Sequence, residues 1–142
     1  MGEVMTEMEK TIEAIDRGDY ATALNISLPL AEQGNAHAQY NLGRMYGDGL
    51  GVSQDYAEAV KWYRKAAEQG NAKAQNKLGL MYKEGRGVSQ DFVQAYMWLD
   101  LAAKKGHEEA KDDRAVVEGK LTKDRIAEAE GLARQWSEKH CE

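Results

Sequence analysis

A histidine followed by acidic residues is the first stretch of this sequence that could do chemistry. Residues 107–111 read HEEAK, which begins like the zinc-binding motif His-Glu-x-x-His. That motif needs a second histidine four residues after the first, but Lys111 occupies the position. His140 and Cys141 offer only two further ligands, at the end of the chain. The sequence therefore predicts no metal and no cofactor, and the two glutamates fit the first turn of a helix, where the helix dipole favours them.

A second stretch that could do chemistry is a heptad that occurs twice. It reads GLGVSQD at residues 49–55 and GRGVSQD at residues 85–91. Paired glycines can bind phosphate through backbone N–H groups, but a phosphate-binding loop follows a strand and ends in lysine followed by serine or threonine. Neither condition holds here, so the heptad is interpreted as a structural joint between helices.

Nucleophiles and carboxylates also lack the spacing that catalysis needs. A serine nucleophile of the Ser-x-x-Lys type has a lysine at the third following position. The four serines have other residues there, namely Leu30 after Ser27, Tyr56 after Ser53, Phe92 after Ser89 and His140 after Ser137. Asp112 and Asp113 are adjacent, so on a helix they point about 100° apart and cannot act as a pair. We therefore expect a protein that is not an enzyme.

Composition excludes further classes of function. The 142 residues are 42% hydrophobic and 30% charged, which is typical of one globular domain. The net charge is −5, which argues against a nucleic-acid-binding surface. No apolar run reaches the roughly 20 residues that cross a bilayer, so no membrane is expected as a partner. The first ten residues lack the apolar segment of a signal peptide, which favours a cytoplasmic protein; the alternative is a periplasmic or secreted protein whose leader was removed.

The heptad belongs to a longer repeat. Residues 35–70 align with residues 71–106 without a gap and agree at 19 of 36 positions. The shared residues recur at spacings of three and four, as on one face of a helix. They include Ala38, Leu42, Met45 and Tyr46 in the first half of the unit, and Ala59, Trp62 and Ala66 in the second half. Each unit is therefore predicted to be a helix, the heptad and a second helix, and its tryptophan to be a core residue.

The residues that differ between the two units form a second stripe, on the other face of the first helix. Packing does not constrain such a face, so we expect it to line a binding groove. The predicted groove consists of His37, Tyr40, Asn41, Arg44 and Asp48 in the first unit, and of Lys73, Asn76, Lys77, Leu80, Lys83 and Glu84 in the second. Apolar side chains among basic ones favour an acidic or C-terminal peptide segment.

Capping residues and partial units complete the predicted architecture. The predicted N-caps are Asn35, Asn71, Asp55 and Asp91, the two aspartates as parts of capping boxes. The predicted left-handed residues at helix ends are Gly34, Gly70 and Gly106. In the first helix, the residues expected to face the core are Met5, Met8, Ile12 and Ile15. Residues 1–34 form an N-terminal helix pair with a kink at Pro29, and residues 107–142 form a capping pair whose last helix starts at Thr122. The whole chain, 1–142, is thus one all-α domain of about eight antiparallel helices.

The repeat resembles a known family. The run A-x-A-Q-x-x-L-G-x-M-Y-x-x-G-x-G-V-x-x-D-x-x-x-A-x-x-W-x-x-x-A-A-x-x-G occurs twice within residues 35–106 and is similar to the Sel-one-like repeat, a relative of the tetratricopeptide repeat. The ending LTKDRIAEAEGLARQW resembles the closing segment of small bacterial members. The resemblance implies a right-handed α/α solenoid that acts as a scaffold or adaptor, with the variable first-helix residues on its concave side.

Three functions follow as expectations. The first is a protein–protein interaction module that binds a peptide segment or a partner surface in the groove. The alternative is a self-associating structural or regulatory subunit, so that the chain is a monomer or a weak homodimer. A remote alternative, a β-lactam-binding or β-lactam-hydrolysing protein, comes from cysteine-rich relatives, but the repeats here contain no cysteine.

Overall fold

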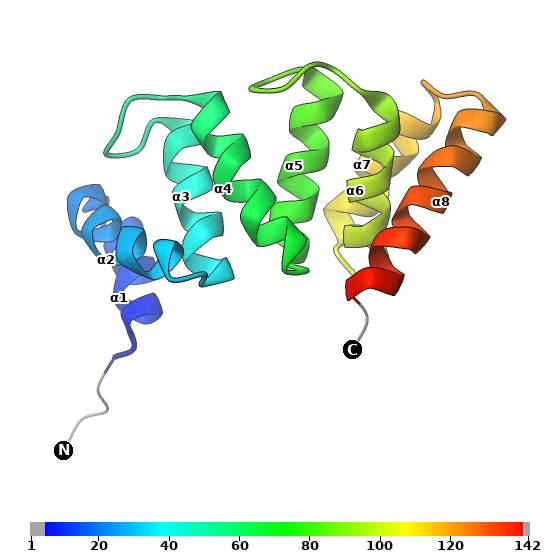
Figure 1. The fold of residues 1–142 in the computed structure, drawn as a ribbon. Coiled ribbons are helices and arrows are strands. Elements are labelled where there is room, and N and C mark those ends of the chain that lie inside the picture. The colour runs from blue at the N-terminus through cyan, green and yellow to red at the C-terminus, as the bar shows by residue number, and fades with distance from the viewer. Residues whose placement is uncertain (1–4, 141–142) are drawn as a thin grey trace.

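The computed structural model describes residues 5–140, which form eight α-helices and no strand. The helices are α1 (Glu7–Asp16), α2 (Tyr20–Glu32), α3 (Ala36–Asp48), α4 (Tyr56–Glu68), α5 (Ala72–Glu84), α6 (Phe92–Lys104), α7 (Glu108–Glu118) and α8 (Lys123–His140). They follow one another in a row from α1 and α2 at one end to α7 and α8 at the other (Figure 1). Each helix from α1 to α6 packs on the next one along the chain. The predicted all-α solenoid is confirmed.

Short polar side chains begin the helices of both full units, as predicted. The Oδ1 atoms of Asn35 and Asn71 each accept a hydrogen bond from the backbone N–H three residues later, at 2.9 Å. Asp55 and Asp91 accept equivalent bonds at 3.1 Å. In a complete capping box, the side chain of Glu58 would also accept a hydrogen bond from the N–H of Asp55. That N–H instead donates to the carbonyl of Tyr46 at 2.9 Å. Backbone bonding rather than a side chain therefore ties the second helix to the end of the first.

Glycines in the heptad let adjacent units approach each other. Gly85 and Gly87 have φ angles of 69° and 72°, in the left-handed region that glycine adopts without strain. Gly87 also lies against the backbone of Tyr56, one unit earlier, where a Cβ would collide with the carbonyl group. The residues predicted to end helices at positive φ, Gly34, Gly70 and Gly106, do so. The heptad is therefore a joint within one unit and a contact between two.

The residues shared by the two units pack between the helices. Trp62 and Trp98 are only 5% and 4% exposed, and the shared alanines Ala38, Ala59 and Ala66 are fully buried, as are their counterparts in the second unit. Gly43 of α3 faces the ring of Tyr63 on α4 so closely that a Cβ would lie 2.5 Å from the ring. Small residues thus set the distance between helices, and the large residues beside them fill the remaining space.

The N-terminal helix pair differs from its prediction. Ile12 is 52% exposed, whereas Thr11 and Ala14 are fully buried. The small side chains of Thr11 and Ala14 allow α1 to pack closely on α2, and the Thr11 hydroxyl donates to the carbonyl of Glu7 at 2.9 Å. The predicted apolar stripe is therefore wrong at Ile12, which lies about 100° around the helix from Thr11, and at Met5, which is 36% exposed and precedes the helix. α2 continues through Pro29, where the predicted kink stays a prediction.

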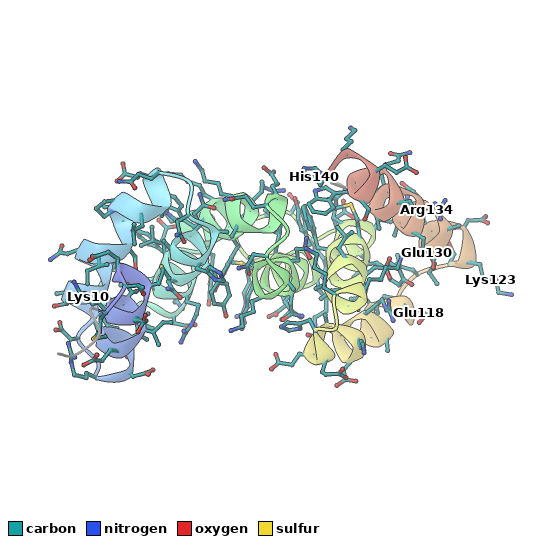
Figure 2. The ribbon with its side chains drawn as sticks, turned by 90° about the horizontal axis from the view of Figure 1, so that it is seen from below. Lys10, Glu118, Lys123, Glu130, Arg134 and His140 are labelled. Carbon is teal, nitrogen blue, oxygen red and sulfur yellow. The ribbon has the colours of Figure 1, made fainter. Side chains whose placement is uncertain are left out.

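The last helix leaves the regular order, because α8 packs against α6 rather than against α7. In Figure 2, α7 and α8 lie on different sides of α6. Thr122 begins α8 as predicted, with its Oγ1 accepting a hydrogen bond from the N–H of Arg125 at 3.2 Å. The ring of Trp136 meets Trp98 edge-on, with the ring centroids 5.9 Å apart. α6 is consequently covered by α5, α7 and α8, and α7 is left with more of its surface free.

Candidate partner-binding groove

The first helices of the units form one side of the row. Seen from below, α1 and α7 extend beyond α3 and α5 on this side, so the row curves around it (Figure 2). A hollow of about 170 Å³ opens between α3 and α5. Its lining includes five of the eleven residues predicted for the groove, namely Arg44, Asp48, Lys77, Leu80 and Glu84. The structure therefore brings together about half of the predicted site.

Residues outside the predicted stripe complete the hollow. Tyr56 and Tyr63 come from α4, Met81 from α5 and Arg86 from the heptad. Tyr63 is 5% exposed, and burial raises the pKa of its phenol well above the usual value. Tyr63 and Arg86 correspond to leucines in the other unit, so they too differ between the units. The sequence difference that could have revealed these two residues lies in the second helix and the heptad, outside the first-helix stripe.

The lining of the hollow carries a small net positive charge, because it holds three cations and two carboxylates. Glu84 pairs with Arg86 at 3.3 Å. Arg44 and Lys77 take part in none of the ion pairs found in the described part of the chain, and only the carboxylate of Asp48 accompanies them in the lining. The lining of the hollow thus combines apolar and aromatic side chains with a small excess of positive charge, which suits an apolar side chain next to an acidic one.

Tyr40 lies beside the hollow and connects it to the rest of the inner surface. Its ring centroid is 5.8 Å from that of Tyr63, and the residue is half-buried. The pKa of Tyr40 is raised mainly by burial; the charge of Arg44 lowers it, and the carboxylates of Glu109 and Asp48 raise it. Glu109 belongs to α7, so a charge on α7 contributes to the electrostatics of a tyrosine on α3.

Two of the predicted groove residues are buried between helices. Asn41 is 6% exposed and Asn76 is 1% exposed. The amide of Asn76 donates to the carboxylate of Asp113 on α7 at 3.0 Å, so the next unit covers it. The expectation that both face water is wrong, because helices on either side leave each inner helix a narrower free face than the sequence stripe. Three further predicted residues lie outside the hollow. His37 and Lys73 are exposed, and Lys83 is half-buried.

Among residues 5–140, no three His, Cys, Asp or Glu side chains converge on a position that could hold a metal ion. His107 is instead the N-cap of α7, and its Nδ1 accepts a hydrogen bond from the N–H of Ala110 at 3.2 Å. The HEEAK stretch therefore begins a helix, as interpreted. His140 stacks on Trp136 with ring centroids 4.1 Å apart, and Cys141 lies outside the described residues.

Within residues 5–140, every helix is too short or too polar to cross a membrane.

A larger and more open hollow, of about 770 Å³, lies between the ends of α4 and α8. Glu68 and Lys139 of its lining take part in no ion pair among residues 5–140, and several other groups there are engaged within the chain. The amine of Lys105 donates to the carbonyl of Gly70, and Trp136 stacks with His140. The smaller hollow therefore offers more free charged groups to a partner, and it is the stronger candidate site.

A row of antiparallel helix pairs with variable residues on its inner side defines the class of α/α-repeat proteins. The chain belongs to the Sel1 repeat family, whose sequence profile matches residues 36–71 and 72–107, about half of the chain. The matched units begin one residue after the predicted starts at 35 and 71. The family that the repeat resembles is thereby confirmed.

Two solved structures share this fold. A protective antigen present in uropathogenic Escherichia coli strains, which displays an SLR fold, is 34% identical, with a TM-score of 0.89 over 94% of this chain. A Sel1 repeat protein from Oxalobacter formigenes is 37% identical, with a TM-score of 0.73 over 84% of this chain. The match covers 30% of the first protein's chain and 54% of the second's, less than two thirds of either. No curated protein matches the chain.

Proposed function

We propose that the chain is a non-enzymatic protein-interaction module that binds a peptide segment or a partner surface along the inner side of α3 and α5. Sel1 repeat proteins are typically protein-interaction scaffolds. The observation that carries the proposal is the hollow between α3 and α5, whose lining mixes charged and apolar side chains, most of which differ between two otherwise similar units. Leu80 and Tyr63 can accept an apolar side chain, and Arg44 and Lys77 favour an acidic residue beside it.

Binding should depend on Arg44 and Lys77, two cations in the lining of the hollow. Peptides are first selected on the full chain from a displayed library of random twelve-residue sequences. In the Arg44→Glu/Lys77→Glu variant, we expect the Kd of a selected peptide to rise at least about tenfold, because attraction at two sites becomes repulsion. Neither side chain takes part in an ion pair within residues 5–140, so the melting temperature should change by no more than about 2 °C. Fluorescence anisotropy and circular dichroism provide the two measurements.

A matched control makes the same change of charge on another face. Lys61 and Lys65 lie over the ring of Trp62 on α4, outside the lining of the hollow. The Lys61→Glu/Lys65→Glu variant should bind the selected peptides as the wild type does. Equal losses in the two variants would show that overall charge alone governs binding, and a selection that yields no peptide sensitive to Arg44 and Lys77 would refute the proposal.

Self-association is a second candidate function, supported by exposed apolar side chains on the first two helices. Ile12 is 52% exposed and Leu28 is 37% exposed. A weak homodimer that buries this edge should give a molar mass that rises with concentration in light scattering. The Ile12→Glu variant should then stay monomeric, because the dimer would bury an unpaired charge. A constant monomer mass for the wild type at the highest concentration would eliminate this candidate.

A further inference from the structure

The inner surface continues onto α7, which is in register with the first helices of the two full units. Ala110 is fully buried, as Ala38 and Ala74 are at the same position of their units. His107 caps α7 from the position at which Asn71 caps α5. An inner-face residue within positions 72–82 of α5 therefore has its counterpart on α7, 36 positions later.

Two charged positions change sign between these helices. Lys73 and Lys77 on α5 correspond to Glu109 and Asp113 on α7. Lys73 and Glu109 are exposed, and the other two are half-buried. Within residues 5–140, no ion pair neutralises any of the four. Asp113 accepts one hydrogen bond, from the uncharged amide of Asn76, which leaves its charge uncompensated. Opposite charges thus stand on neighbouring helices of one surface.

An apolar side chain accompanies the charges on each helix. Leu80 lines the hollow on α5, and Val116 occupies the corresponding position on α7. Val116 is 54% exposed, the most exposed large hydrophobic residue in the described part of the chain. The apolar character of this position is therefore kept from α5 to α7 while the charge beside it is reversed.

We propose that the inner surface binds an extended peptide in one order, with an acidic residue over α5, apolar residues against Leu80 and Val116, and a basic residue over α7. The proposal rests on the proposed function and specifies its ligand. Packed helices lie 8–10 Å apart and an extended chain advances about 3.3 Å per residue, so the acidic and basic residues should be about three positions apart. The opposite order would place like charges together, which complementary surfaces avoid.

The order is tested with peptides selected on the full chain from the random twelve-residue library. Those that no longer bind the Leu80→Glu variant are groove binders, and the Arg44→Glu/Lys77→Glu variant identifies them if Leu80→Glu does not fold. One groove binder is synthesised, together with a second peptide in which its acidic and basic residues exchange places. We expect the wild type to bind the first peptide at least about tenfold more tightly than the second.

A charge exchange in the protein gives the complementary measurement. The Lys73→Glu/Glu109→Lys variant keeps the net charge and alters only exposed side chains. Its preference for the first peptide should fall at least about threefold. Equal affinity of the wild type for both peptides would overturn the proposed order and leave the groove as a binding site. A library without groove binders would instead overturn the proposed function.

Discussion

Replacement of Arg114 by leucine should lower the free energy of unfolding by about 2 kcal/mol, although leucine is the residue that the repeat favours at this position. Leu42 and Leu78 occupy it in the two full units, and both are fully buried. In the third unit, Arg114 pairs with Asp100 of α6 at 2.6 Å. The side chain of Asp100 is 3% exposed, so the variant leaves a buried carboxylate with Lys104 as its remaining partner, at 3.0 Å.

The size of the expected loss of stability follows from the exposure of the Arg114 and Asp100 side chains. Loss of one partner from a fully buried pair costs about 3–5 kcal/mol. Here the side chain of Arg114 is 30% exposed and Lys104 remains, so solvent and the second cation reduce the loss. Urea-induced unfolding, followed by circular dichroism, measures the change.

The double variant Asp100→Leu/Arg114→Leu is the matched control. It removes both charges, and leucine is the residue found at the register of Asp100 in the N-terminal unit, at Leu28. Replacement of a buried pair by apolar residues is often neutral or stabilising, so most of the lost stability should return. If the single variant is as stable as the wild type, the ion pair between α6 and α7 contributes nothing to folding.

A single methyl group at Gly43 should destabilise the protein by about 2 kcal/mol. The Cβ of an alanine there would lie 2.5 Å from Cδ1 and 2.6 Å from Cε1 of the Tyr63 ring. The ring is 5% exposed, so it can move aside only if the contact between α3 and α4 opens. Alanine is the better helix former by about 1 kcal/mol, but overpacking of this kind costs more.

Gly47 provides the control on the same helix. At that position the nearest atom to a new Cβ is the Cβ of Ala59, at an ordinary 3.6 Å. The Gly47→Ala variant should therefore be as stable as the wild type, or more stable by up to about 1 kcal/mol. Thermal unfolding of the Gly43→Ala and Gly47→Ala variants measures the difference in stability. Equal melting temperatures would contradict the close approach of α3 and α4 at Gly43.

The helices, their boundaries and the stacking of the units could be predicted from the sequence. Asn35 and Asp91 cap helices through bonds to residues three positions away, and Gly85 turns the chain within a few residues of its own position. The shared residues Trp62 and Trp98 lie in the core because every unit meets its neighbour in the same way. All these interactions are local or are repeated from unit to unit, so one sequence comparison reveals them.

The groove could be predicted only in part. Arg44 and Leu80 line the hollow as expected, but Asn76, on the same stripe, is buried against α7. Tyr63 and Arg86 complete the site from α4 and the heptad, where nothing in the first-helix stripe pointed to them. A stripe defines a side of a helix, whereas the free part of that side depends on how far the neighbouring helices reach over it.

The sequence by itself determined the family, the order of the helices and most of their capping residues, and the faces on which the residues shared by the two full units pack. Only the tertiary structure decided that α8 packs on α6, that Ile12 faces outward and that Asp100 and Arg114 pair between α6 and α7. The physical reason is the distance along the chain over which each interaction acts. Caps and helical periodicity act within a few residues, whereas burial and ion pairing at the ends of a repeat array depend on which distant surface arrives there, and the repeat does not specify that surface.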